Sequence, residues 1–358
     1  MLVQPDAISW FAPENIADTL DAGQCFHLRA PSQLLIFMIV TKDRALSRGH
    51  TIGNVRKTLI LSNGGHPMDP AALQPVQLPY RYEFAPSETA AIAACNRDHG
   101  FAVVRGVLDR TQVEQLKETT WRVLDPERTL KPGETRGQGD FIEHAPPLWD
   151  LLEHEDFLRL NRAILGTSDL TVHRSAAILK NAGAGPVTWH TDWNGYSPLP
   201  ARTPNEVLNR GEWPNGMWFY LNGTHPSRAG LAVIADSHTI DWAGPEGFAF
   251  TEYRRSFHPR GEEPKVHDRF EVPGMVPLFT EPGDLIVFNT RTYHAAFPHG
   301  GSEARLSCGF VFRPSAPPFP APWALTESAR RFCAALPSRL HPFVREYTGL
   351  DPAWKLAE

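Results

Sequence analysis

The chain contains 358 residues, and 42% of them are hydrophobic, which is enough to bury one large core or two smaller ones. A formal net charge of -5 and an isoelectric point near 6.3 give no electrostatic basis for binding nucleic acid or an anionic membrane. The four cysteines show no C-x-x-C spacing, which argues against a disulfide framework or a zinc ribbon and favours reduced thiols in the cytosol.

Residues 1–85 are predicted to form an N-terminal extension that packs on the core. They carry two strand-like runs, LLIFMIV at residues 34–40 and TLILSNGG at residues 58–65, followed by a polar, proline-containing passage. The first run is too short to cross a bilayer and too far from the start of the chain to be the core of a signal peptide. We expect it to form a buried strand.

The main domain is predicted to span residues 86–315 and to open with a helix, a strand and a second helix. Ser87 can cap the first helix and Gly100 can end it, after which FAVVRGV has the composition of a strand. Asp109 then opens an amphipathic helix.

The middle of the chain is rich in short strands that glycine and proline turns separate. They are GMWFYLNG, AGLAVIADSH, GDLIVFNTRTYHAAF and ARLSCGFVFRP. Because no helices intervene, the pattern favours antiparallel sheets closed into a sandwich or barrel, a mainly β fold with flanking helices. Residues 316–358 are predicted to be a helical tail that begins at Thr326 and is interrupted by Pro337 and Pro342.

A histidine and a carboxylate two residues apart could bind one metal ion, and two such pairs occur. With 15 histidines and 40 acidic residues, chance accounts for this number. The pair His154 and Asp156 lies in a segment with leucines at helical spacing, residues 147–165, which predicts His154 on a polar, solvated helix face. His190 and Asp192 follow the β-favouring VTW, and in an extended segment both side chains point to one face, with Cα atoms roughly 7 Å apart. Half of a metal site and an accident of composition both stay open for this second pair.

The later sequence PGDLIVFNTRTYHAAFPHGGSEARLSCGF supplies a further histidine and a cation. We expect residues 285–297 to form one strand, and the PHGGSEA turn to return the chain into a second strand. A symmetric hairpin sets His294 opposite Arg305, with Cβ atoms about 5 Å apart, and puts Ser307 on the same face as Arg305. Taken singly, Arg305 also fits a cross-strand ion pair, and His294 also fits a core histidine with satisfied hydrogen bonds.

The combination of these residue types points to a particular chemistry. Two neutral imidazoles and one carboxylate on one face of an octahedral ion leave three positions open, as in non-haem Fe(II) oxygenases. A keto-acid cosubstrate can take two positions, and its far carboxylate suits an arginine, which stays charged and binds carboxylates through two parallel hydrogen bonds. A zinc hydrolase could use the same ligands with bound water, and a non-catalytic binding protein could keep the scaffold. Arg305 separates the oxygenase from the hydrolase, which needs no distal cation.

At these motifs the chain resembles the phytanoyl-CoA dioxygenase-like family of Fe(II)/2-oxoglutarate oxygenases. The matching pieces are, in order, DHGFAVVRGVLD, WHTDW, AGLAVIADSH and PGDLIVFNTRTYHAAFPHGGSEARLSCGF, and they cover about residues 88–315. The resemblance implies a double-stranded β-helix fold, Fe(II) as the metal and 2-oxoglutarate as the cosubstrate. The residues that it assigns are the metal ligands His190, Asp192 and His294 and the cosubstrate-binding residues Arg305, Ser307 and Trp218.

Two details of the match differ from the family pattern. The sequence IADSH stands where relatives usually have PGSH, which changes a turn and no ligand, and the spacing from Trp218 to Gly230 is slightly different. His238 in that turn, and His225 before it, are expected to make structural hydrogen bonds.

The expected reaction is hydroxylation by O2 of a small, largely apolar metabolite, with desaturation or ring formation as variants. Related halogenases carry a small residue at the position of Asp192 and bind halide in the vacated place, so a carboxylate here favours hydroxylation. An acyl-CoA is the alternative substrate, but residues 252–271 hold five basic and five acidic side chains and offer phosphates no net charge. The aromatic residues Tyr196, Trp213, Trp218 and Phe219 favour an apolar pocket, although they could also fill the core.

Overall fold

The computed structural model describes residues 69–213, 215–264 and 270–357, together with the backbone of three strands that precede them. The chain divides into two compact units, Met1–Met68 and Asp69–Glu358. The predicted domain boundaries near residues 85 and 315 stay predictions.

The first unit contains a three-stranded antiparallel sheet in the order β1-β2-β3. Its strands are β1 (Phe26–Arg29), β2 (Leu34–Ile39) and β3 (Thr58–Asn63). The second and third strands are those predicted from the two apolar runs. The predicted burial of the LLIFMIV strand concerns side chains that lie outside the described residues.

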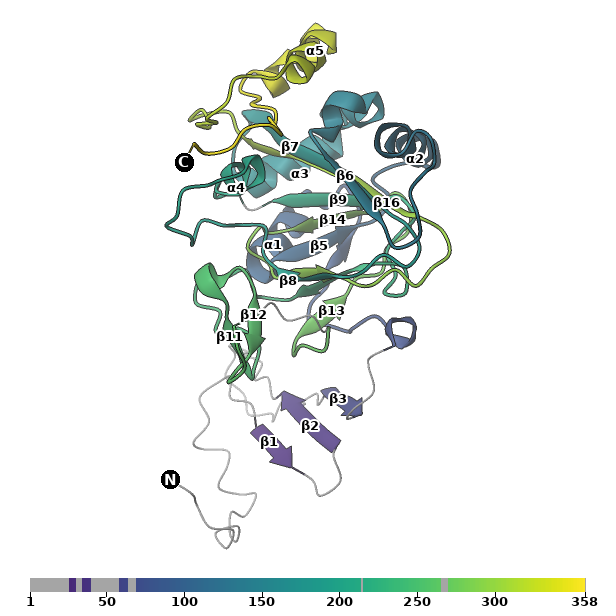
Figure 1. The fold of residues 1–358 in the computed structure, drawn as a ribbon, viewed down its shortest axis with the longest axis vertical. Helices are drawn as coiled ribbons and strands as arrows, with labels where there is room; N and C mark the ends of the chain where they lie inside the picture. Colours follow the sequence, from purple (N-terminus) through teal and green to yellow (C-terminus); the bar gives the residue numbers. More distant parts are fainter. Residues whose placement is uncertain are drawn as a thin grey trace, which may run out of the picture. The chain divides into compact units, whose positions relative to one another are not determined.

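A seven-stranded sheet is the larger layer of the second unit (Figure 1). Its strands, in spatial order, are β4 (Glu83–Phe84), β5 (Phe101–Val104), β14 (Leu285–Phe288), β9 (Gly216–Tyr220), β16 (Arg305–Pro314), β7 (Leu170–Lys180) and β6 (Thr135–Gly139). All neighbouring strands are antiparallel except β4 and β5, which run parallel. The β16 strand pairs with β7 along its whole length, with one register shift between Val311 and Phe312.

A four-stranded antiparallel sheet forms the second layer. Its strands, in spatial order, are β13 (Met275–Pro277), β10 (Leu231–Ile234), β15 (His294–Ala296) and β8 (Val187–His190). Side chains from both sheets meet in one buried cluster, among them Tyr220 and Ile286 from the larger sheet and Val233 from the smaller one. Two antiparallel sheets around a common core, with the chain passing from one to the other, form the predicted double-stranded β-helix.

Helices cover the outer face of the seven-stranded sheet (Figure 1). They are α1 (Thr89–His99), α2 (Arg110–Leu124), η3 (Phe141–His144), η4 (Pro146–Leu152), α3 (Glu155–Leu165), α5 (Glu327–Ala335) and η6 (Ser338–Val344). Along β16, Leu306, Cys308 and Phe310 belong to the apolar cluster beneath these helices. Because successive side chains of a strand alternate between faces, Arg305 and Ser307 point to the other sheet.

Local signals in the sequence explain where the first helices begin and end. The side chain of Asp109 accepts a hydrogen bond from the Gln112 backbone at 2.8 Å, and the Gln112 side chain accepts one from the Asp109 backbone at 2.9 Å. Gly100 ends α1 at a φ of 82°, which glycine adopts without strain. The N-cap of α1 is Glu88 and not the predicted Ser87, and the Glu88 carboxylate accepts a hydrogen bond from the Ala85 backbone at 2.8 Å.

The segment predicted as one helix at residues 147–165 is two helices. One ends at Leu152 and the next begins at Glu155, with His154 between them as the N-cap. Nδ1 of His154 accepts a hydrogen bond from the Phe157 backbone at 3.3 Å, so the imidazole satisfies a helix-terminal donor. The predicted place of His154 on a helix face is wrong, since leucine spacing continues unchanged across a helix break.

The strand predicted at residues 285–297 is likewise two strands, and they lie in different sheets. One ends at Phe288 in the seven-stranded sheet, and the other begins at His294 in the four-stranded sheet. Between them Asn289 donates its backbone N–H to Gly100 O at 2.8 Å and accepts a hydrogen bond from the Thr292 backbone at 2.8 Å. This turn redirects the chain from one layer to the other.

The predicted pairing of His294 with Arg305 is therefore wrong. His294 pairs with His190 and Val233, whereas Arg305 pairs with Lys180 in the other sheet. The PHGGSEA turn crosses between the layers and does not close a hairpin within one sheet.

The remaining elements of the second unit are short. They are η2 (Pro70–Ala72), α4 (Pro204–Leu208), η5 (Glu252–Arg254) and a two-stranded sheet of β11 (Phe248–Phe250) and β12 (Phe257–Pro259). No helix within the described part of the chain has the length and apolar character needed to cross a membrane.

Candidate metal centre

Three side chains with metal-binding atoms meet at the four-stranded sheet. His190 ends β8 and His294 begins β15, and the two residues are paired across these antiparallel strands. Asp192 follows β8 closely, and one ligand atom from each of the three side chains lies within 4.8 Å of the other two. Oδ1 of Asp192 is 3.9 Å from Nε2 of each histidine. The structure thus brings together the three residues that the sequence analysis assigned as metal ligands.

Backbone carbonyls orient both imidazoles toward this point. Nδ1 of His190 is 2.7 Å from Thr188 O, and Nδ1 of His294 is 3.0 Å from Thr292 O. Because a carbonyl only accepts hydrogen bonds, Nδ1 carries the proton in both rings and Nε2 keeps a free lone pair. This second contact of each ring is the usual way in which a protein fixes the tautomer of a metal ligand.

Electrostatics hold Asp192 and His294 in the protonation states that metal binding requires. Burial opposes the charge on Asp192, but His294, Arg174 and His190 outweigh it, and the pKa of the carboxyl falls to about 2. Burial, reinforced by His190, lowers the pKa of His294 to about 4. At neutral pH the carboxylate is therefore charged and the His294 imidazole is neutral, so neither has to lose a proton before it binds a metal.

Arg174 contacts the candidate metal site, and the sequence analysis did not find it. It lies on β7 in the larger sheet, and its Nη2 is 3.2 Å from Oδ2 of Asp192. Its Nη1 donates to the side chain of Asn209. The guanidinium therefore holds one carboxylate oxygen and leaves Oδ1 for the two histidines. Strand alternation around Arg174 was the only signal in the sequence, and it does not reveal a partner on another sheet.

Arg305 lies between the two sheets with its side chain almost fully enclosed. The residue is 4% exposed, and its guanidinium carbon lies 4.9 Å from the ring centroid of Tyr220. Nη1 donates to Ala229 O at 2.9 Å, and Nη2 is 3.4 Å from Oγ of Ser307. Nε has no hydrogen-bond partner. Among the described residues, no carboxylate forms an ion pair with this cation.

Trp218 shares the inner face of β9 with Tyr220, two residues further along. It is half-buried and packs against the apolar cluster between the sheets. Phe219 points the opposite way, into the cluster beneath the helices, so of the two alternatives left open for the aromatic residues it follows the second and fills the core. A shift by one residue along a strand changes the sheet face, which explains the difference.

These donors fit an Fe(II) ion and a keto-acid cosubstrate. The two imidazole nitrogens and one carboxylate oxygen match the ligand set of non-haem iron oxygenases. The buried guanidinium with an unused Nε matches the need of a dicarboxylate for a cation, because a buried charge without a partner is costly.

A small pocket opens beside the carboxylate of Asp192. Its lining includes His173, Arg174, Leu208, Asn209, Trp213 and Thr290. A further aromatic ring lies beside a metal-binding side chain, because the ring of Phe288 is 4.8 Å from the ring of His294 between centroids. Both aromatic and polar side chains are therefore available around the candidate metal site.

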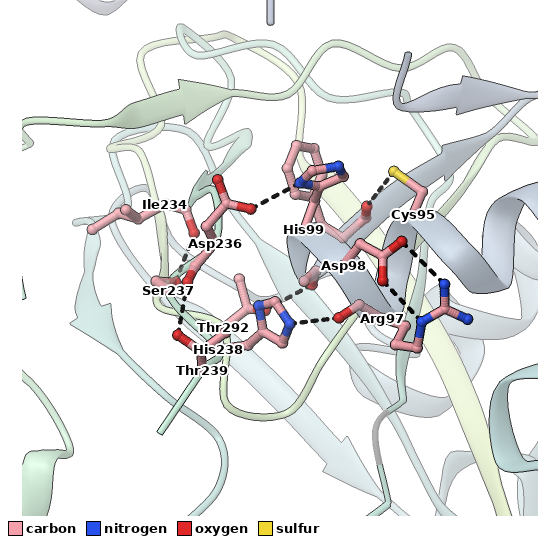
Figure 2. A network of polar contacts seen from close by, with 12 residues as sticks. Cys95, Arg97, Asp98, His99, Ile234, Asp236, Ser237, His238, Thr239 and Thr292 are labelled. Atoms are coloured by element: carbon pink, nitrogen blue, oxygen red, sulfur yellow. Dashed lines mark hydrogen bonds and ion pairs between the residues drawn. The ribbon is translucent and has the colours of Figure 1, made fainter. Parts of the chain in front are cut away.

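Ser237, His238 and Thr292 lie close together in one network of polar contacts (Figure 2). Nε2 of His238 donates to Arg97 O at 2.8 Å, as expected for a structural histidine. Oγ of Ser237 accepts a hydrogen bond from the Tyr293 backbone at 2.9 Å, and Thr292 donates its hydroxyl to Gly100 O at 2.7 Å. The contacts fix the two residues that precede His294.

His225 also makes a local contact, because its Nδ1 is 2.7 Å from Oγ of Ser227. Both histidines that were expected to be structural thus have partners of that kind. Neither belongs to the group of metal-binding atoms around Asp192.

The sequence model of the phytanoyl-CoA dioxygenase (PhyH) family matches residues 96–307, which is more than half of the chain. No curated protein sequence matches this chain. Among solved structures, EctD from S. alaskensis is 18% identical with a TM-score of 0.48, covering 72% of this chain and 85% of that one. The epimerase SnoN, in complex with Fe3+, alpha ketoglutarate and nogalamycin RO, is 21% identical with a TM-score of 0.45, covering 75% and 94%. HygX from Streptomyces hygroscopicus, with nickel, 2-oxoglutarate and hygromycin B bound, is 16% identical with a TM-score of 0.45, covering 62% and 86%. At these values the likeness carries no argument about a substrate.

Proposed function

Since the chain belongs to the phytanoyl-CoA dioxygenase (PhyH) family of Fe(II)- and 2-oxoglutarate-dependent dioxygenases, we propose that His190, Asp192 and His294 hold the iron. The observation that carries this assignment is the convergence of their ligand atoms within 4.8 Å. The bound iron and 2-oxoglutarate together activate O2 to oxidise a substrate, releasing succinate and CO2.

The protein's own residues bind and orient these groups. The neutral imidazoles offer their Nε2 lone pairs, and Arg174 keeps Asp192 turned so that Oδ1 faces them. Arg305, with Ser307 beside it, binds the distal carboxylate of 2-oxoglutarate, and Trp218 borders the cosubstrate chain. Burial of Arg305 strengthens this contact, because a charge pair is screened less inside the protein than in water.

We further propose that the enzyme hydroxylates a small, largely apolar metabolite of the terpenoid, polyketide or amino-acid-derived kind. A carboxylate at position 192 leaves no vacant place for halide, which supports oxygenation over halogenation. Trp213 in the pocket beside Asp192, and Phe288 against the ring of His294, support an apolar substrate. Desaturation or ring formation are variants of the same oxidation, and the cytosol is the proposed location.

An acyl-CoA hydroxylase is the second candidate because of the family to which the chain belongs. Phosphates of coenzyme A need clustered basic side chains, and the basic residues in the 252–271 segment are matched by acidic ones. Part of that segment, residues 265–269, lies outside the described residues.

Succinate release from 2-oxoglutarate, measured with Fe(II) across a panel of metabolites and acyl-CoA thioesters, tests the activity and the substrate class together. Stimulation by a CoA-free apolar compound, with an oxygenated product by mass spectrometry, is the expected result. Stimulation by an acyl-CoA but not by its free acid contradicts the substrate proposal, and a chlorinated product contradicts the reaction type. Metal binding that survives His294→Ala with full activity contradicts the assigned ligands.

A further inference from the structure

Lys180 and Arg305 face each other across two strands of the larger sheet. They are paired in the register of β7 and β16, and each is only 4% exposed. Buried lysines are rare in proteins unless an acid pairs with them. Within the described residues neither Lys180 nor Arg305 forms an ion pair, so the protein encloses two adjacent cations without a compensating charge.

The hydrogen bonds of Lys180 leave much of its ammonium group unused. Nζ donates to Gly185 O at 3.0 Å, in the turn that leads from β7 to β8. An ammonium group has three donors, so two stay available for a ligand. On the neighbouring strand, Nε of Arg305 is likewise without a partner.

Within the described part of the chain, the other polar groups around the two cations, including Thr135 opposite Lys180 on β6, are neutral or positive. Ser307 and Tyr220 contact Arg305, and His299, in the turn before β16, is influenced by Lys180, Arg305 and Arg228. Burial and the charge of Arg305 lower the pKa of Lys180 to about 8. Burial also lowers the pKa of His299, so this imidazole is uncharged at neutral and alkaline pH. The surroundings therefore favour an anion.

We propose that Lys180 is a second cationic ligand of the distal carboxylate of 2-oxoglutarate, acting together with Arg305. This inference rests on the proposed function, which assigns that carboxylate to Arg305. A planar guanidinium fixes the direction of a carboxylate through paired hydrogen bonds, whereas a lysine adds a compact charge from another direction. Lys180 would thus make the site selective for keto acids that carry a second carboxylate.

The first test compares two keto acids that differ only in the distal carboxylate. Binding of 2-oxoglutarate and of 2-oxopentanoate is measured by calorimetry on the Mn(II)-loaded protein, with wild type, Lys180→Met and Arg305→Met. We expect Lys180→Met to lower the affinity for 2-oxoglutarate about tenfold or more, as for a lost charge-assisted hydrogen bond. The affinity for 2-oxopentanoate should stay unchanged. Lys131→Met, at an exposed position, is the matched control.

The second test can be decided on the wild-type protein, with the lysine variant as a further check. Because a bound carboxylate favours the charged ammonium group, 2-oxoglutarate binding should take up a proton at about pH 8.5, where a lysine with a pKa of about 8 is mostly neutral. Calorimetry in buffers of different ionisation enthalpy measures this uptake. The affinity should also fall about tenfold between about pH 7 and about pH 9. In Lys180→Met both the uptake and the pH dependence should disappear.

The outcomes separate this inference from the proposed function. Suppose that Arg305→Met lowers the affinity for 2-oxoglutarate while Lys180→Met binds it like wild type. Lys180 then only anchors the turn at Gly185, and this inference is wrong while the proposed function stands. A wild-type protein that takes up no proton at alkaline pH also overturns it. If wild type does not bind 2-oxoglutarate, or Arg305→Met is without effect, the proposed site of the cosubstrate itself is wrong.

Discussion

The two sheets of the β-helix contribute opposite chemistry to the space between them. The four-stranded sheet carries His190 and His294, and Asp192 follows one of its strands; together these offer lone pairs and one negative charge. The seven-stranded sheet carries Arg174, Lys180 and Arg305, which offer only positive charge.

The two sheets also differ in whether their charged and metal-binding side chains have partners within the protein. On the smaller sheet each ligand side chain is already held by a partner through its other polar atom: carbonyls orient the histidines at Nδ1, and Arg174 holds Oδ2 of the aspartate. On the larger sheet Arg305 and Lys180 have no acid partner within the described part of the chain. In the proposed function a metal ion would satisfy the ligands on the first sheet and a dicarboxylate the cations on the second, so 2-oxoglutarate would join the two.

The largest effect is expected on the metal side. Replacing His294 by alanine removes one of the three proposed protein ligands and should reduce both Fe(II) binding and succinate release below detection, because the proposed site has only three protein ligands. Anaerobic metal titration and a succinate assay measure the two quantities. His341→Ala, at an exposed position, should leave both unchanged. Full activity of His294→Ala would contradict the assignment of metal binding to the four-stranded sheet.

A smaller effect, confined to the cosubstrate, is expected on the cationic side. Arg305→Met should raise the 2-oxoglutarate concentration needed for half-maximal rate by about 10- to 150-fold, the equivalent of roughly 1.5 to 3 kcal/mol for a hydrogen bond to a charged group. Fe(II) affinity without 2-oxoglutarate should change little, because Arg305 does not contact the three metal ligands. Steady-state kinetics and metal titration distinguish the two quantities. An unchanged 2-oxoglutarate requirement would mean that another residue holds the distal carboxylate.

Arg174 lies on the larger sheet and contacts Asp192 beside the smaller one. Its loss should weaken metal binding without abolishing it. Arg174→Met frees Oδ2 of Asp192 from its 3.2 Å contact, so the carboxylate loses its fixed orientation. We expect Fe(II) affinity to fall about 10- to 100-fold, as for other groups that orient a metal ligand, with detectable activity at saturating iron. The matched control is Arg159→Met on the solvent side of α3. Metal affinity equal to wild type would show that Asp192 is held adequately by its backbone.

The sequence predicted some of these features and missed others for physical reasons. Antiparallel sheets closed into a sandwich or barrel followed from short strands separated by turns, and the resemblance to the family specified the double-stranded β-helix. Spacing in an extended segment allowed His190 and Asp192 to lie on one face, because alternation is local, and the resemblance to the family assigned both as ligands. His294 was also predicted, but its neighbour was not: the pairing with Arg305 assumed a hairpin, whereas the chain crosses to the other sheet at Asn289. Contacts between layers, such as that of Arg174, depend on sheet order, which strand periodicity does not encode.

The smallest effect is expected on stability, from the buried residue His173. This histidine has no proposed ligand, in contrast to His294. His173 is 3% exposed, packs against Trp213 and Phe319 at 4.6 and 5.1 Å between ring centroids, and donates from Nε2 to Leu208 O at 3.0 Å. Burial lowers its pKa to about 3, with Arg174 and Arg313 adding to the effect.

A lowered pKa of this kind makes the fold less stable in acid. The unfolded chain binds a proton near its ordinary value of about 6.5 while the folded chain resists it, so the free energy of unfolding falls as pH drops from about 6.5 toward 3. One such group contributes up to about 1.4 kcal/mol per pH unit, or roughly 2 kcal/mol at pH 5. His173→Phe should lower the free energy of unfolding by about 1 kcal/mol at neutral pH, because a hydrogen bond is missing. That free energy should then fall less steeply as the pH drops than it does in wild type. Urea unfolding of the metal-free protein between pH 7.5 and 5 measures both curves. Parallel curves for wild type and variant would mean that the acid sensitivity originates elsewhere in the fold.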